Sequence, residues 1–151
     1  MMNNMISINR SAKHDYTVIE EIKCGIVLKG WEVKGLIQHG SSLKQAYVEI
    51  TNGEVFIRNL TIMPTVNTCS HTKPKPNADR KLLLTKKQIG KLIGEVQVIG
   101  NTLIPLSIER VGSLIKVNIA LAKGKKKFDK RNDLKDAEWK RKQNKIFKKA
   151  L

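Results

Sequence analysis

Most of the chain shows the alternation of apolar and polar residues that is typical of half-buried β-strands. In the segment LIKVNIAL (114–121), apolar residues at every second position from Ile115 to Leu121 alternate with Lys116 and Asn118. Successive side chains of a strand point to opposite faces, so this pattern predicts a strand with one buried face. The segment HDYTVIEEI (14–22) predicts a second strand.

Turn residues divide the apolar runs into hairpins. In YVEITNGEVFI (47–57), Asn52-Gly53 accepts the positive φ angles of a tight turn between two strand-like runs, which predicts a hairpin. Further turns are predicted at Gly100-Asn101 and near Gly112, and Pro105 indicates an edge strand or a bulge. The polar, proline-containing segment 68–80 is expected to be an exposed loop.

Helical signals are fewer than strand signals. Thr85 and Gln88 have the spacing of a capping box ahead of a periodic apolar run, which predicts one short helix. The segment KCGIVLKGWEVKGLI (23–37) is compatible with a short helix or with a strand. In the strand alternative, Glu32 and Lys34 lie on the same face.

These elements predict a chain that is mainly β with short helices. Several short antiparallel strands, one interposed helix and few aromatic residues (5%) favour a small OB-like barrel. The alternation of apolar residues stops after Leu121, where the composition becomes strongly basic. We therefore expect a flexible N-terminus at 1–9, an OB-like barrel at 10–122 and a basic tail at 123–151.

The net charge indicates a polyanionic partner. The formal charge is +16, and residues 123–151 hold 13 Lys/Arg and four Asp/Glu, so that the last fifth of the chain carries more than half of the excess. The sequence contains no run of about 18 apolar residues that could span a bilayer. The first residues, MMNNMISINR, lack the basic-then-apolar order of a signal peptide, so a cytoplasmic protein without a membrane partner is expected.

The sequence offers no set of catalytic residues. It lacks a Walker motif and the GxGxxG, GxSxG and HExxH patterns, and His14 with Asp15 makes a poor dyad because neighbours in a strand point to opposite faces. Cys69 and His71 have no second ligand pair to complete a zinc site, and Cys24 is isolated. We expect no enzyme activity, no metal site and no cofactor.

Four blocks, taken in order, resemble one known family. They are KHDY at 13–16, GIVLKGWEVK at 25–34, RKLLL at 80–84 and ALAKGKKKFDKRNDLKDAEW at 120–139. Together they are similar to SmpB, the tmRNA-binding family of bacterial trans-translation, along nearly the whole chain. The resemblance implies an OB-related barrel that binds the tRNA-like domain of tmRNA and helps to deliver it to stalled ribosomes, together with elongation factor Tu.

The resemblance also directs attention to the barrel residues that would contact RNA. Gly124 lets the backbone approach a phosphate, and the adjacent lysines supply charge that is independent of sequence. By resemblance Glu32 contacts RNA beside Lys34, accepting hydrogen bonds from unpaired base edges, whereas a surface ion pair between the two is the alternative. The predicted RNA-binding set is Glu32, Lys34, Lys123, Gly124, Lys125 and Lys126.

The tail is expected to act on the ribosome. A helix capped by Asp133 is possible from Asn132 onward, but its apolar stripe is thin and its like charges repel. We expect disorder in solution and a helix on the ribosome. By resemblance the tail enters the decoding centre of the small-subunit rRNA and the empty mRNA channel, with Asp129–Arg131 as a hinge. The residues assigned to this role are Phe128, Asp129, Lys130, Arg131, Trp139, Ile146 and Phe147.

Phe128 departs from the family pattern, because the family commonly has histidine there. Stacking on a base would be the function that both residues share.

A ribosomal protein with a basic rRNA-binding tail is the alternative function. A generic single-strand-binding barrel would need more aromatic residues for base stacking than the 5% in this sequence. A monomer is expected.

Overall fold

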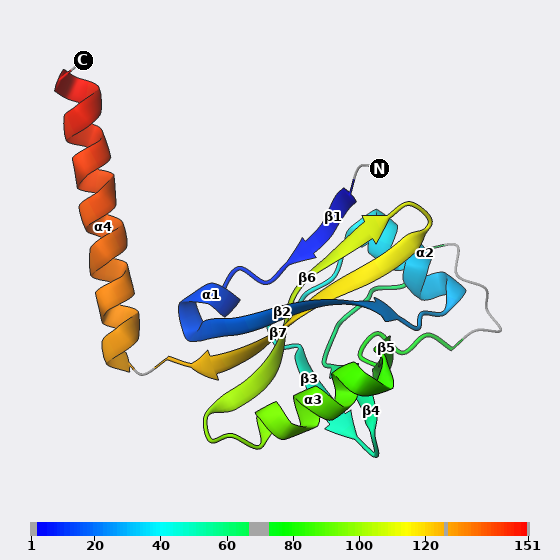
Figure 1. The fold of residues 1–151 in the computed structure, drawn as a ribbon. Helices are drawn as coiled ribbons and strands as arrows, with labels where there is room; N and C mark the ends of the chain where they lie inside the picture. The colour runs from blue at the N-terminus through cyan, green and yellow to red at the C-terminus, as the bar shows by residue number, and fades with distance from the viewer. Residues whose placement is uncertain (1–2, 67–72, 126, 151) are drawn as a thin grey trace.

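The computed structural model of the chain describes residues 3–66, 73–125 and 127–150 (Figure 1). The predicted fold class is confirmed: the structure is mainly antiparallel β with short helices. The elements are β1 (Asn3–Ile8), α1 (Ala12–Asp15), β2 (Tyr16–Ile26), α2 (Gly30–His39), β3 (Tyr47–Thr51), β4 (Glu54–Arg58), β5 (Arg80–Leu83), α3 (Lys86–Val96), β6 (Asn101–Val111), β7 (Leu114–Gly124) and α4 (Lys127–Ala150).

The strands form a ring that is nearly a closed barrel. The order β6-β3-β4-β5-β2-β7 returns to its start because β6 also pairs with β7. The seam between β3 and β6 is held by the registered pair Val48 and Leu103. β1 lies outside the ring, paired with the C-terminal half of β6. Because the ring is nearly closed, few strands leave their backbone N–H and C=O groups unpaired at an edge. A short chain can therefore form a stable sheet.

The alternating residues of β7 fill the core as the sequence predicted. Val117, Ile119 and Leu121 are each at most 1% exposed. Near its end β7 is buried on both faces, because Ala120 and Ala122 pack in a second small cluster with Ala12 of α1. Small side chains suit this packing, since Ala12 belongs to the same buried cluster.

The predicted turns are also confirmed. Asn52 (φ 53°) and Gly53 (φ 75°) join β3 to β4, and Gly100 and Gly112 adopt positive φ at the two ends of β6. The register between β6 and β7 shifts between Pro105 and Ser107, which is the bulge that the proline indicated.

The helices α2 and α3 both begin with capping contacts. The Thr85 hydroxyl accepts a hydrogen bond from the backbone N–H of Gln88, whose side chain accepts one from the backbone N–H of Thr85, so the predicted capping box of α3 is confirmed. The segment 30–39 is a helix, and the strand alternative is wrong. Glu32 accepts a hydrogen bond from the backbone N–H of Lys29 at 2.8 Å, which fixes the start of α2.

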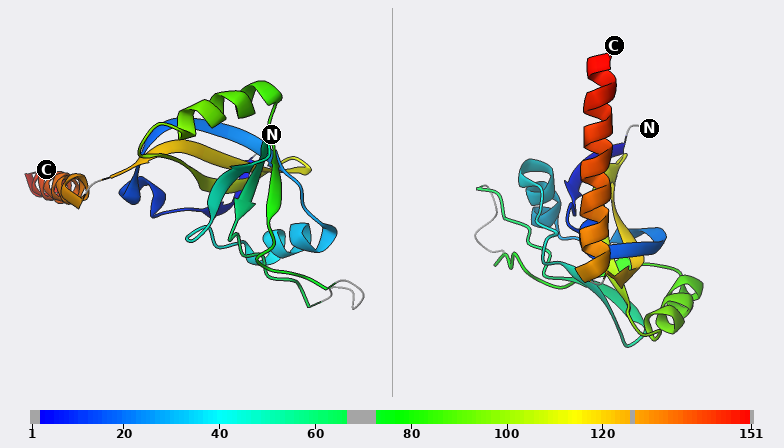
Figure 2. Two further views of the ribbon diagram at one scale, coloured as in Figure 1. Left: turned by 90° about the horizontal axis from the view of Figure 1, so that it is seen from below. Right: turned by 90° about the vertical axis from the view of Figure 1, so that its left-hand side faces the viewer.

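The tail forms a helix that projects away from the barrel (Figures 1 and 2). It begins at Lys127, not at the predicted cap Asp133, so the proposed hinge at Asp129–Arg131 lies inside α4. The physical reason is that Gly124 is the last glycine and the chain has no proline beyond it, so no residue after Lys125 interrupts a helix. Whether the free tail is disordered in solution stays a prediction.

Candidate nucleic-acid interface

The end of β7 forms an open basic edge beside α1. The backbone N–H groups of Gly124 and Lys125 donate to the carbonyl oxygens of Gly100 and Asp15, at 3.4 and 2.9 Å. A side chain at Gly124 would meet nothing within 4 Å, so its backbone faces open space. This open backbone leaves room for a phosphate to approach closely, and RNA contact at Gly124 stays a prediction.

The two described lysines of this edge are held in different ways. Lys123 is exposed, and its aliphatic stem packs on Gly100, where an added Cβ would lie 3.3 Å from the stem. Lys125 donates through Nζ to the carbonyl oxygen of Lys13 at 3.0 Å. Lys126 lies outside the described residues. Lys123 thus presents its charge to solvent, whereas Lys125 ties the edge to α1.

A second hollow lies where β1 leads into α1, and the sequence analysis did not single it out. Its volume is about 470 Å³, and its lining includes Arg10 and Lys44. The serines Ser11, Ser41 and Ser42 line the same pocket. No periodic pattern could have revealed it, because β1, α1 and the segment after α2 are brought together only by the fold.

Glu32 is buried, which overturns the expectation that it lies on an RNA-facing surface. It is 3% exposed and forms an ion pair with Arg80, which is equally buried. Lys34 is exposed on the same helix and is not the partner of Glu32. The alternative, a surface ion pair between Glu32 and Lys34, is therefore also wrong. The helical turn carries Glu32 inward and Lys34 outward, since residues two apart do not face each other on a helix.

A pocket opens directly above this buried pair. Its volume is about 390 Å³, and its wall includes Trp31 and Phe56. Five cationic residues and two carboxylates line it, namely Lys29, Lys73, Lys75, Arg80, Lys81, Glu32 and Asp79. Trp31 and Glu32 belong to the block GIVLKGWEVK (25–34) of the sequence analysis. They thus contribute to a cationic pocket, with Glu32 in its floor.

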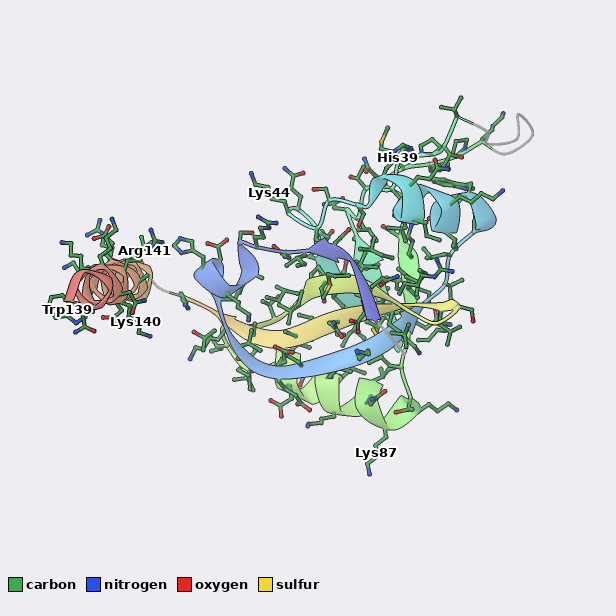
Figure 3. All side chains as sticks on the ribbon, turned by 90° about the horizontal axis from the view of Figure 1, so that it is seen from above. His39, Lys44, Lys87, Trp139, Lys140 and Arg141 are labelled. Atoms are coloured by element: carbon green, nitrogen blue, oxygen red, sulfur yellow. The ribbon has the colours of Figure 1, made fainter. Side chains whose placement is uncertain are left out.

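The tail presents polar and apolar groups around one helix. Trp139 is 62% exposed and Leu134 is 54% exposed. Figure 3 shows Trp139, Lys140 and Arg141 projecting from different sides of α4, and Arg131 is exposed on the same helix. The side chains of Phe128, Asp129, Lys130, Ile146 and Phe147 lie outside the described residues, although their backbone belongs to α4.

The described residues show no alternative site for metal or thiol chemistry. Within them, no group of three His, Cys, Asp or Glu side chains could hold a metal ion. Burial raises the pKa of the Cys24 thiol to about 12, and the thiol donates to the carbonyl oxygen of Val117. Cys24 is therefore a protonated core residue. None of the helices in the described ranges is long and apolar enough to cross a bilayer.

Comparison with known proteins identifies the family. The family model described as SmpB protein matches residues 6–149. An SsrA-binding protein of Methylobacillus flagellatus (strain ATCC 51484 / DSM 6875 / VKM B-1610 / KT) is 44% identical over 146 residues, which cover 97% of this chain and 95% of the relative. The chain belongs to the SmpB family.

A solved structure supports the same assignment. It is described as "tmRNA-SmpB: a journey to the center of the bacterial ribosome", and it matches with a TM-score of 0.65 and 38% identity over 80% of this chain and 85% of the other. The resemblance noted in the sequence is thereby confirmed. SmpB is a family of RNA-binding proteins without enzyme activity, so the absence of a catalytic motif agrees with the family.

Proposed function

We propose that this SmpB-family chain binds the tRNA-like domain of tmRNA and brings it to ribosomes stalled in translation. The observation that carries the proposal is the 44% identity along 97% of the chain with an SsrA-binding protein. The basic edge at Lys123–Gly124–Lys125 supplies a surface that suits the backbone of a folded RNA.

The proposal divides the work between barrel and tail. The barrel recognises RNA by shape, through its basic edge and its cationic pocket, while α4 occupies the decoding centre and the empty mRNA channel. Support for the second role comes from the position of α4, which projects away from the barrel and keeps its charged sides accessible. Elongation factor Tu takes part in delivery, and the site of action is the cytoplasm.

A reconstituted rescue reaction tests this function. Ribosomes stalled on an mRNA without a stop codon are supplied with alanylated tmRNA, elongation factor Tu and the purified protein. The expected result is a tagged and released peptide that requires the protein. Tagging that is equally efficient without the protein would contradict the proposal. A ribosomal protein would instead stay on the subunits through a high-salt wash, whereas a rescue factor is released.

A further inference from the structure

Lys125, the last described residue before α4, is bound to α1 at two points. Its backbone N–H donates to the carbonyl oxygen of Asp15 at 2.9 Å, and its Nζ donates to the carbonyl oxygen of Lys13 at 3.0 Å. The last carbonyl oxygens of a helix have no partner within the helix, and a lysine ammonium group is well suited to bind them. Lys125 therefore caps the C-terminal end of α1, although 112 residues separate it from Lys13.

The helix α1 is itself fixed on the barrel. Ala12 is 2% exposed and packs in a buried cluster with residues of β6 and β7. Just before the helix, Asn9 donates through its backbone N–H to the carbonyl oxygen of Leu106 at 2.7 Å and through Nδ2 to that of Pro105 at 3.0 Å. Because α1 is anchored in this way, a residue that binds its C-terminal end is held in a defined position on the barrel.

The residue before Lys125 does not restrict the direction of the chain. Gly124 has the backbone freedom of a glycine, and an added Cβ there would meet nothing within 4 Å. Its backbone N–H makes only a long hydrogen bond, of 3.4 Å, to the carbonyl oxygen of Gly100. Figure 1 shows α1 beside the point where β7 ends, and α1 also approaches α4. The contacts of Lys125 with α1 are therefore the restraint that follows the glycine.

We propose that Lys125 is a positioning residue that sets the direction in which α4 leaves the barrel. The 24 residues of α4 form a helix about 36 Å long, so a turn of about 20° at its base would move its far end by about 12 Å. This inference rests on the proposed function, in which the barrel holds the RNA while α4 enters a channel of the ribosome. Lys123 then offers its charge to the RNA, whereas Lys125 acts through α1.

The two lysines can be separated by matched variants. K123M removes an exposed charge, so it should weaken binding of the tRNA-like domain about three- to tenfold and lower the salt dependence by about one counterion. K125M should cost less affinity, because the ammonium group of Lys125 is already bound to the carbonyl oxygen of Lys13.

The rescue reaction then distinguishes positioning from binding. At protein concentrations that saturate the RNA, K123M should reach the wild-type maximal rate of tagging, whereas K125M should reach about a tenth of it. A full maximal rate for K125M overturns the inference, whatever its affinity for RNA. K125R keeps a donor for the carbonyl oxygen of Lys13, so it should restore the maximal rate to within about twofold of the wild type. A K125R protein as slow as K125M would also overturn the inference.

The direction of α4 can be measured with two spin labels in a C69S background. Figure 3 shows Lys87 projecting from α3 and Lys140 from α4, so K87C and K140C place one label on the barrel and one on the tail. In the stalled-ribosome complex the wild-type protein should give one narrow distance distribution, and K125M should broaden or shift it. Equal distributions for the two proteins overturn the inference.

Hydrogen exchange of the free protein supplies an arm that needs no ribosome. The backbone N–H of Lys125 should exchange at least about tenfold more slowly than in an unstructured peptide, because it is bonded to Asp15. An unprotected Lys125 amide overturns the inference. Failure of the wild-type protein to support tagging would instead refute the proposed function, and the exchange measurement distinguishes these two failures.

Discussion

Arg80 of β5 and Glu32 of α2 form an ion pair whose side chains are 2% and 4% exposed, although 48 residues separate them in the sequence. Arg80 also donates to the carbonyl oxygens of Leu60 and Pro76. One guanidinium group therefore joins α2 to both ends of the long connection between β4 and β5. The pair holds the floor of the cationic pocket in place.

Breaking this pair should cost much more stability than breaking an exposed one. R80M leaves the Glu32 carboxylate buried without its counter-charge, so we expect the free energy of unfolding to fall by about 3–5 kcal/mol in urea denaturation. The control K81M removes the exposed pair between Lys81 and Glu54, and it should cost at most about 1 kcal/mol.

A double variant separates the ion pair from simple loss of packing. In E32Q/R80M no uncompensated charge remains, so the loss should be smaller than the sum of the losses for E32Q and R80M. Strict additivity of the two single losses would show that Glu32 and Arg80 do not act as a pair.

Two glycines should respond to alanine in opposite directions. Gly100 has φ of +87° and supports the stem of Lys123, so G100A should destabilise the barrel by about 1 kcal/mol or more and weaken RNA binding by displacing Lys123. Gly94 lies in α3, and an added Cβ there meets nothing within 4 Å. G94A should stabilise the protein by about 0.5–1 kcal/mol and leave RNA affinity unchanged. Thermal unfolding and RNA titration of both variants measure these effects. A destabilised G94A would contradict the open space assigned to this face of α3.

The sequence predicted best those features that depend on neighbouring residues. The alternation in β7, the Asn52-Gly53 turn and the Thr85–Gln88 capping box are local signals, and the structure confirms each of them. The helix α2 could not be decided, because Gly30 and Gly35 lower helix propensity while the apolar positions fit either period.

The candidate site was less predictable than the fold. The partner of Glu32 is an arginine 48 residues away, and only the folded chain brings α2 and β5 together. The pocket above them combines residues of α2, β4 and β5 with the segment before β5. The sequence pointed to the block GIVLKGWEVK (25–34) as important, but it placed Glu32 on the surface because no single-sequence pattern reveals a long-range partner.

Cys24 should be unreactive in the folded protein. Burial raises the thiol pKa from 9.0 to about 12, so very little reactive thiolate is present at neutral pH. In a C69S background, modification by a disulfide reagent should be slow at pH 8 and should accelerate in urea. Rapid modification without denaturant would contradict the burial of this thiol.

The raised pKa of the Cys24 thiol also predicts how the stability of the protein depends on pH. Between pH 9 and 12 the unfolded chain loses the Cys24 proton while the folded chain keeps it, so this group's contribution to stability is full below pH 9 and declines as pH rises. C24A should reduce that part of the alkaline decline, at some cost in packing. If the stability of C24A declined at alkaline pH as steeply as that of the wild type, Cys24 would not be a cause of the decline.

Deleting residues 131–151 should separate binding from rescue. The barrel and its basic edge end before this segment, so affinity for the tRNA-like domain should stay within about twofold of the full chain, while tagging of stalled peptides is lost. Filter binding and the reconstituted rescue reaction measure the two quantities. Equal loss of both would contradict the division between barrel and tail.

The most direct test of the central proposal is the affinity of the full chain for the tRNA-like domain of tmRNA, measured across a salt titration with an ordinary tRNA as competitor. Recognition by a basic surface of defined shape predicts tight binding that weakens steeply with salt and that excess tRNA displaces poorly. Displacement by ordinary tRNA at equal concentration, at every salt concentration, would show that the +16 charge alone drives binding and would contradict specific recognition of the tRNA-like domain.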